Sequence, residues 1–432
     1  MSRTGSAGLV LPIVIGRAVR FLTRLRGGGS AYPGFIARKI RPTFVRDVVA
    51  QLPDGIVVIL GSNGKSTTTN MVTGILREHG LRVFTNPSGA NLPQGIASSL
   101  LGEVSLTGKL DADIGVIEVD EAFGQVLCRE LKPTGAVILN LQIDQIYRFF
   151  EPERVAGMFR DIVGEVSELV VLNRDDNFLS TLGTKLEGEG RIKVQYFGVD
   201  DAVLAAAPHG QVLARDYENE GTAPVDRAVE AEVVASAGNT ASISFRGQIH
   251  ELALSARGLH YAVDAAGAIT LAAGVLGDRF SIDTAVSALA TTKTVYGRGE
   301  VLVHDGQNIE ILLLKNLASL QMNLDYLDGV PESVLLAFDE GSKDPSWLYA
   351  ADFSGLRHVD VISGPKAAFI ALRLEYAGVT YGTIEPSIEK AVQLILASPY
   401  PSDGTRTFIL DYDQMLLTRK YLGHSDLESD DS

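Results

Sequence analysis

The chain of 432 residues is 46% hydrophobic and 21% charged, a globular composition that excludes disordered, collagen-like and coiled-coil proteins. Its formal net charge of −15 argues against non-specific binding to a nucleic-acid backbone, so we expect no nucleic-acid partner. The single cysteine, Cys128, allows neither an internal disulfide nor a multi-cysteine zinc cluster, and we expect a cytoplasmic protein without zinc. The length allows about two to four domains, of which we expect three.

Residues 1–44 are predicted to form a basic, amphipathic N-terminal segment. The apolar run 9–15 is too short to span a bilayer, and arginines follow it instead of preceding it as in a signal peptide. Apolar residues from Leu11 to Leu25 recur at helical spacing, and the basic residues among and after them are Arg17, Arg20, Arg24 and Arg26. Two interpretations remain open: the helix lies on an anionic membrane surface, or it packs on the body of the protein with its arginines in water.

Residues 45–300 alternate short apolar runs with longer helical ones, the pattern of a parallel sheet covered by helices. The predicted strands and helices are 55–60, 66–80 (helix), 82–85, 94–101 (helix), 114–119, 135–139 and 169–172. Alternating hydrophobicity within 201–256 predicts an antiparallel excursion from this sheet.

A second α/β rhythm follows a helix that begins at Ile282 and the segment Tyr296–Glu300. We place the domain boundary near residue 300 and a second α/β domain at 301–420. Its predicted strands are 309–314, 333–338, 359–362 and 407–410. The acidic tail, 421–432, is expected to fray.

The strongest functional signal is a glycine-containing loop between the apolar run ending at Leu60 and a helical stretch. In such a loop, backbone N–H groups and the positive end of the helix dipole face an anion. The predicted cofactor-binding residues are Gly61, Ser62, Asn63, Gly64, Lys65, Ser66 and Thr67. Lys65 would lie along the β- and γ-phosphates, and the Ser66 hydroxyl would bind Mg²⁺. Ile59 stands where the full pattern has glycine, so the loop is a shortened variant; the alternative is a chance turn with Lys65 in water.

Polar residues follow two further predicted strands, at the edge of a parallel sheet where ligands bind. Glu118 is a candidate Mg²⁺ ligand, with Asp120 or Glu121 assisting; the alternative is a solvated loop acid. Asn140 follows the run 135–139, and its amide has the donor and acceptor needed to bond an adenine edge. It would otherwise cap the next helix.

These motifs resemble the Mur ligase family and, within it, the MurT subunits of lipid II isoglutaminyl synthase. The resemblance covers most of residues 15–420, with a gap near 201–256. Its segments, in chain order, are 61–66, 85–92, 95–100, 118–122, 140–145, 173–176, 196–198, 296–300, 314–318, 344–348, 351–353 and 363–378.

The resemblance implies an α/β fold in which a Mur ligase-like central P-loop domain with a parallel sheet, at 45–300, is followed by a MurT-type α/β domain at 301–420. It implies ATP- and Mg²⁺-dependent amidation of the α-carboxylate of D-glutamate in the stem peptide of lipid II, through an acyl phosphate that ammonia attacks. By the same resemblance Lys65, Glu118 and Asp344 are catalytic, Ser66 and Glu118 hold Mg²⁺, and Arg298 lies near the nucleotide.

The resemblance further implies a partner, a GatD-type glutaminase that supplies the ammonia and whose Cys–His pair is completed by Asp344. Asp352 is the reserve candidate, and Asp344 could instead be a turn residue before Pro345. Cys128 lies in a helical pattern and is interpreted as a packing residue. Peripheral contact with the inner membrane surface, where lipid II lies, is part of this expectation.

Two departures from the MurT pattern bear on the interpretation. Where many MurT proteins carry a four-cysteine zinc ribbon, residues 201–256 contain no cysteine, and His260 and Asp264 replace a more usual asparagine-rich helix start. Two alternatives therefore stay open, a Mur-like ligase that adds an amino acid and a non-catalytic nucleotide-binding scaffold. A third, a nucleic-acid helicase or partition-type ATPase, is disfavoured by the shortened loop and the net charge.

Overall fold

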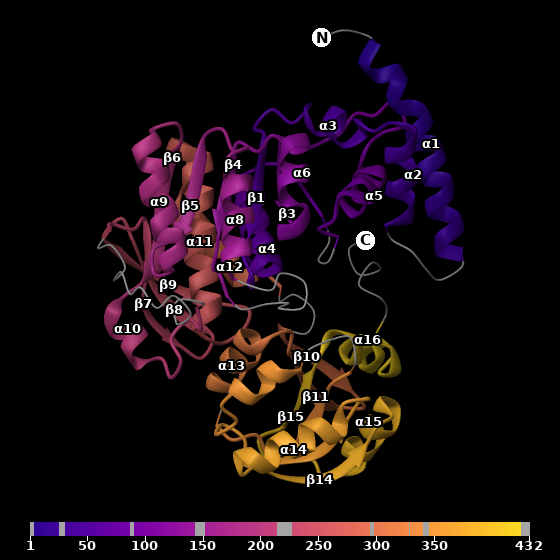
Figure 1. The fold of residues 1–432 in the computed structure, drawn as a ribbon, viewed down its shortest axis with the longest axis vertical. Helices are drawn as coiled ribbons and strands as arrows, with labels where there is room; N and C mark the ends of the chain where they lie inside the picture. Colours follow the sequence, from indigo (N-terminus) through magenta and orange to yellow (C-terminus); the bar gives the residue numbers. More distant parts are fainter. Residues whose placement is uncertain are drawn as a thin grey trace.

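The computed structural model describes residues 4–25, 31–86, 90–142, 152–213, 227–293, 298–327, 329–339 and 345–424. They form two α/β units, each built on its own sheet (Figure 1). The first sheet has nine strands in the order β2-β3-β1-β4-β5-β6-β7-β8-β9, and the second has six in the order β10-β11-β15-β12-β13-β14.

The first sheet begins with six parallel strands. They are β1 (Ile56–Leu60), β2 (Val83–Thr85), β3 (Ile114–Glu118), β4 (Gly135–Ile138), β5 (Leu169–Asn173) and β6 (Lys193–Val199). Strand β1 lies between β3 and β4, so the segments that follow these three strands meet at one edge of the sheet. The predicted strands 55–60, 114–119 and 135–139 are thereby confirmed.

Helices cover both faces of this sheet, because alternate residues of β1 enter two different cores. Val57 and Ile59 pack with α4 (Lys65–Glu78), α11 (Leu259–Leu276) and α12 (Ile282–Thr291). Val58 and Leu60 pack on the other side, with helices that include α6 (Glu121–Leu131), α8 (Pro152–Val163) and α9 (Asn177–Glu189). The segment Leu259–Arg279 is long and apolar enough to cross a membrane, but 83% of its apolar 18-residue stretch is buried in the protein, as expected of a core helix.

The predicted antiparallel excursion is present at the edge of the same sheet. After α10 (Asp201–Ala206), strand β7 (Ala231–Ala237) pairs parallel with β6, and β8 (Thr240–Phe245) and β9 (Gln248–Ala253) continue antiparallel. The region that lacks cysteines therefore extends the sheet through ordinary strand pairing.

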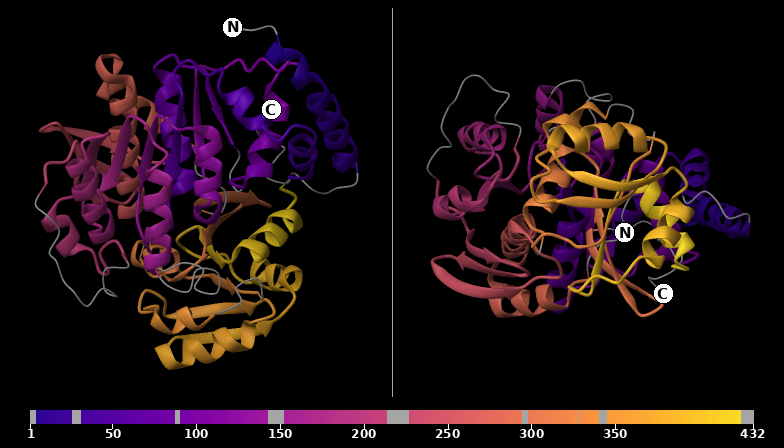
Figure 2. Two further views of the ribbon diagram at one scale, coloured as in Figure 1. Left: turned by 45° about the horizontal axis from the view of Figure 1, so that its top comes forward. Right: turned by 90° about the horizontal axis from the view of Figure 1, so that it is seen from below.

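The second unit has a mostly parallel sheet with one antiparallel edge strand, β10. Its strands are β10 (Arg298–His304), β11 (Gln307–Leu313), β12 (Val334–Ala337), β13 (His358–Ser363), β14 (Thr380–Glu385) and β15 (Thr405–Leu410). Its helices are α13 (Leu317–Asp325), α14 (Ala367–Ala377), α15 (Ile388–Ala397), α16 (Tyr412–Tyr421) and the short 3-10 helix η3 (Ser346–Ala350). Figure 2 shows this unit packed beside the first one, from two further directions.

The N-terminal segment forms α1 (Thr4–Leu25) and α2 (Tyr32–Ile40) and is followed by α3 (Phe44–Val49). Helix α1 packs on α2 and on α5 (Pro93–Glu103). This packing agrees with the second of the two open interpretations, except that Arg17 does not lie in water. The Arg17 guanidinium donates to the carbonyl oxygens of Leu101, at 2.9 Å, and Val104, because these carbonyls at the end of α5 lack intrahelical partners.

Candidate nucleotide site

The loop between β1 and α4 depends on a glycine at the start of the helix. Gly64 caps α4 in the left-handed region, with φ of 83°. A Cβ atom at this position would lie 2.3 Å from Oδ1 of Asp264, so a side chain there would force the Asp264 carboxylate to move. The first N–H groups of α4 have no acceptor within the helix, and they lie at the sheet edge where ligands bind. This arrangement makes the loop suitable for an anion.

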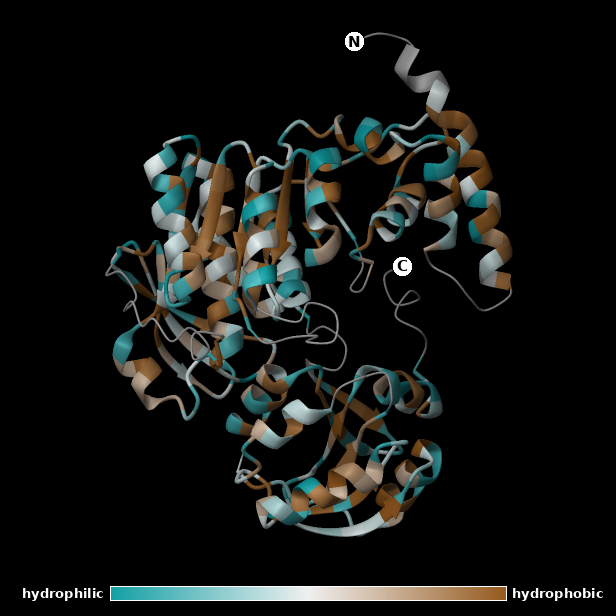
Figure 3. Cartoon of the chain, viewed as in Figure 1, coloured by the Kyte–Doolittle hydropathy of each residue, from teal (hydrophilic) through white to brown (hydrophobic). Residues whose placement is uncertain are grey.

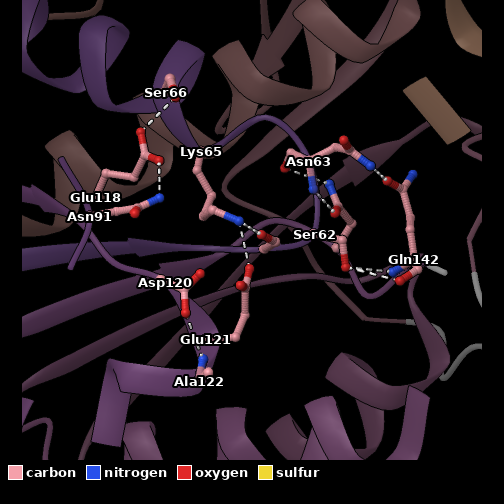
Figure 4. Close-up of polar contacts among 12 residues, drawn as sticks. Ser62, Asn63, Lys65, Ser66, Asn91, Glu118, Asp120, Glu121, Ala122 and Gln142 are labelled. Carbon is pink, nitrogen blue, oxygen red and sulfur yellow. Dashed lines mark hydrogen bonds and ion pairs between the residues drawn. The ribbon is translucent and has the colours of Figure 1, made fainter. Parts of the chain in front are cut away.

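Lys65, the first residue of α4, is buried in an ion pair. Its Nζ donates to the carbonyl oxygen of Gly61 and to Oε1 of Glu121, each at 2.6 Å (Figure 4). The ammonium group is therefore held over the loop, and an incoming phosphate would compete with Glu121 for it.

Ser66 and Glu118 form the adjacent part of the site. The Ser66 hydroxyl donates to Oε2 of Glu118 at 2.6 Å, and Nδ2 of Asn91 donates to Oε1 at 3.0 Å (Figure 4). The backbone N–H and C=O of Glu118 both bond the amide of Asn86, at 2.9 and 3.0 Å, which fixes the strand end. A hydroxyl and a carboxylate oxygen are ligands that Mg²⁺ accepts, so this pair fits the predicted metal. Among the described residues, no group of three or more histidine, cysteine, aspartate or glutamate side chains forms a metal site.

The two acids that follow Glu118 have different contacts. Asp120 is the N-cap of α6, where its carboxylate accepts the N–H of Ala122 at 3.1 Å. Glu121 instead turns to Lys65. Of the two predicted assistants, Glu121 therefore contacts the loop lysine and Asp120 caps a helix.

Asn140 and Gln142, which follow β4, hold the loop from the other side. The Asn140 amide accepts the N–H of Asn63 at 3.0 Å and donates to its carbonyl at 3.2 Å. Gln142 exchanges hydrogen bonds with the Ser62 hydroxyl through its backbone and accepts Nδ2 of Asn63 at 2.6 Å through Oε1. The sequence analysis named Gln142 only as part of the segment 140–145. Its position two residues after Asn140 could have indicated that it also contacts the loop.

The second unit also reaches the loop. The amides of Asn63 and Asn316 bond each other at 3.3 Å, and Nζ of Lys315 lies 3.4 Å from the carbonyl oxygen of Ser62. Both residues belong to the motif 314–318, but sequence reasoning gave neither a role at the loop. Asn316 stays fixed because it also caps α13 in a capping box with Ser319.

An open cavity lies at this junction of the two units. Its lining comes from the loop, from α11 and from the second unit, and includes Asn63, Gly64, Thr67, Asn140, His260, Asp264, Lys315 and Tyr326. The atypical residues His260 and Asp264 are thus part of the cavity wall.

The remaining predicted residues either lie apart from the loop or have side chains that the structure does not describe. Asp344 lies outside the described residues, and so does the side chain of Arg298, whose backbone begins β10. Asp352 is half exposed, and the N–H of Ser354, which hydrogen-bonds its carboxylate, lowers the pKa of Asp352 below its usual range. Cys128 is buried in the core, as expected of a packing residue.

Comparison with known proteins is consistent with this geometry. A family model for the Mur ligase middle domain matches residues 59–272. The MurT subunit of lipid II isoglutaminyl synthase (glutamine-hydrolyzing) from Streptococcus pneumoniae is 28% identical over 449 residues, which cover 95% of this chain and 96% of that protein. The chain belongs to the Mur ligase family. The MurT subunit from Staphylococcus aureus strain COL is 25% identical and matches 92% of this chain and 93% of its own.

Among Mur ligases of known structure, MurF from Thermotoga maritima, solved in complex with ADP, is similar with a TM-score of 0.62 at 18% identity. The match covers 90% of this chain and 84% of that one. The predicted Mur ligase-like α/β fold is confirmed. Mur ligases are ATP-dependent, which agrees with a phosphate loop at the centre of the first sheet.

Proposed function

We propose that this Mur ligase is the synthetase subunit of a lipid II isoglutaminyl synthase, which amidates the α-carboxylate of D-glutamate in the stem peptide of lipid II. The observation that carries the proposal is the similarity to MurT subunits over nearly the whole chain, including the second unit. The partner would be a GatD-type glutaminase, and the complex would work at the inner membrane surface, where lipid II is anchored.

The chemistry needs ATP because a carboxylate at neutral pH is a poor electrophile for ammonia. The γ-phosphoryl group passes to a carboxylate oxygen, ADP leaves, and the acyl phosphate forms. Ammonia then attacks the carbonyl carbon, phosphate departs with the former carboxylate oxygen, and the amide loses a proton. Lys65 and the N–H groups at the start of α4 offset the negative charge of the transferring group. Mg²⁺ held by Ser66 and Glu118 would supply further charge neutralisation.

The chain cannot use its own cysteine to release ammonia from glutamine. Cys128 is the only cysteine, and burial, with a smaller contribution from the charge of Glu165, raises its thiol pKa to about 12. A nucleophilic thiolate is therefore absent at neutral pH. A glutaminase partner supplies this function, and in our proposal Asp344 completes its Cys–His pair.

The test is amidation of lipid II by the purified complex with glutamine and ATP. Lys65→Ala should abolish ATP turnover, whereas Lys390→Met, on the exposed face of α15, should not change it. Unaltered turnover in Lys65→Ala would remove the proposed ATP site. Ligation of a free amino acid without a partner would instead favour an amino-acid ligase, and ATP binding without turnover would favour a scaffold.

The proposed triad acid is tested separately. In the complex with the glutaminase, Asp344→Asn should lose ammonia release while ATP binding is kept, and Asp352→Asn should retain both. Loss of ammonia release in Asp352→Asn alone would transfer the role to Asp352.

A further inference from the structure

Helix α1 has its apolar stripe on the outside of the protein. Seven residues of α1 are exposed in the part where side chains are described, 8–23 and 25, and all seven are apolar: Val10, Leu11, Val14, Ala18, Phe21, Leu22 and Leu25. At about 100° per residue they lie within one-third of the helix circumference and cover roughly 22 Å of its length. Figure 3 shows α1 at the edge of the molecule, with hydrophobic colour along it.

The opposite side of α1 is already used for packing. Leu9 and Ile13 are buried in the core, and Arg17 bonds the carbonyl oxygens at the end of α5. The helix therefore cannot rotate its apolar stripe inward without losing these contacts. Tyr32 and Phe35 of α2 are exposed as well, so aromatic side chains extend the apolar surface of the N-terminal layer.

The charge of the same segment indicates which kind of partner could cover this surface. Residues 1–44 contain seven arginines and one lysine but no aspartate or glutamate, although the whole chain carries −15. Two of these arginines, Arg38 and Arg41, pair with Glu130 and Asp47, and the segment stays basic without them. A second copy of the chain would bring two such basic segments together across a symmetric interface, which is unfavourable. An anionic lipid surface matches both the positive charge and the apolar stripe.

We propose that α1 is an in-plane membrane anchor, whose stripe from Val10 to Leu25 enters the headgroup region of an anionic bilayer. The inference stands on exposure and charge and does not depend on the proposed amidation. It specifies which face of the protein meets the membrane. Arg17 joins that face to α5. The loop before α5 contains Asn91, which hydrogen-bonds Glu118, so the anchor lies in the same part of the protein as the acidic end of β3.

The experiment is flotation of the full chain with vesicles of phosphatidylcholine, with and without phosphatidylglycerol. We expect binding to the anionic vesicles that weakens with added salt, because exposed charges are screened. Phe21→Glu should weaken binding by roughly tenfold or more, and Leu25→Glu is a second variant at an equally exposed site. The matched control is Ile249→Glu, because Ile249 is 66% exposed on β9 and Phe21 is 65% exposed.

The outcomes separate this proposal from other occupants and from the proposed function. Equal vesicle binding by wild type and Phe21→Glu, or none by either, overturns it. A dimer or a glutaminase complex that dissociates in Phe21→Glu, without vesicle binding by wild type, would make the stripe a protein interface and also overturn it. Lys65→Ala should bind vesicles as wild type does, because Lys65 lies in the phosphate loop and not on α1. Vesicle binding therefore tests the anchor independently of ATP turnover, which tests the proposed function.

Discussion

Gly64 and Gly80 share a backbone conformation but have different surroundings. Their φ angles are 83° and 85°, and a Cβ would meet Asp264 at 2.3 Å in the first case and nothing within 4 Å in the second. Alanine at either position costs about 1 kcal/mol for the left-handed backbone. Only Gly64→Ala adds a clash in the loop, so we expect it alone to lose ATP binding in calorimetry. Equal ATP affinity in both variants would contradict the loop assignment.

The hydroxyl of Ser66 is the feature that its proposed metal role requires. Ser66→Thr keeps a hydroxyl next to Glu118 and should retain Mg²⁺-dependent ATP turnover within a few-fold. Ser66→Ala removes the ligand and should lower kcat by about 100-fold, the magnitude typical of one lost electrostatic contact at a transferring group. Steady-state ATP turnover across a Mg²⁺ titration measures both variants. An alanine variant as active as the threonine variant would rule out the hydroxyl as a ligand.

At the scale of single elements, burial influenced which strands could be predicted from the sequence. Strands β1, β3, β4 and β5 are buried along their whole length and were predicted from their apolar runs. Strand β14 lies at the edge of the second sheet and is mostly exposed, so its mixed composition gave no apolar run to detect. Interior strands tend to be apolar because both of their faces are covered, but β6 lies between β5 and β7 and was not among the predicted strands.

Helix α16 begins at a buried aspartate, Asp411, whose pKa is raised. Asp411 caps the helix by accepting the N–H of Gln414, and it also accepts the N–H of Asp339 at 2.6 Å. Burial raises the pKa of Asp411 to about 7, and the negative charge of Asp339 adds to this rise. The folded protein thus keeps a proton that the unfolded chain releases near pH 4. The stability from this proton is complete below about pH 4 and is lost as the pH rises through about 7.

The free energy of unfolding of the wild type should decrease between pH 5 and 8 as Asp411 loses its proton. In Asp411→Asn this decrease should be smaller by on the order of 2 kcal/mol, because asparagine does not titrate. Urea denaturation at several pH values measures this slope, which is insensitive to any pH-independent cost of the lost hydrogen bond. Asp200→Asn, which replaces the N-cap of α10, is the matched control. A slope unchanged from wild type in Asp411→Asn would show that another group is responsible.

For the whole molecule, the main feature is the junction of the two α/β units at the phosphate loop. The cavity has walls from both units, and Lys315 is a cation that the second unit brings to the loop. We expect Lys315→Met to raise KM for ATP or lower kcat by roughly tenfold, with the unfolding free energy nearly unchanged, since Lys315 is partly exposed. Lys390→Met, on the same unit but exposed on α15, is the control. Identical kinetics in the two variants would place Lys315 outside the reaction.

The sequence by itself determined the features whose parts are contiguous: the loop 61–67, the strand before it, the helix after it, and the acid Glu118 at the end of the next apolar strand. Only the tertiary structure decided the contacts between distant segments. It paired Glu121 with Lys65, and it brought Lys315 to Ser62 across 253 positions of the chain. The physical reason is that periodicity reports the face that a residue presents locally, whereas these contacts depend on strand order and on how two independently formed sheets pack.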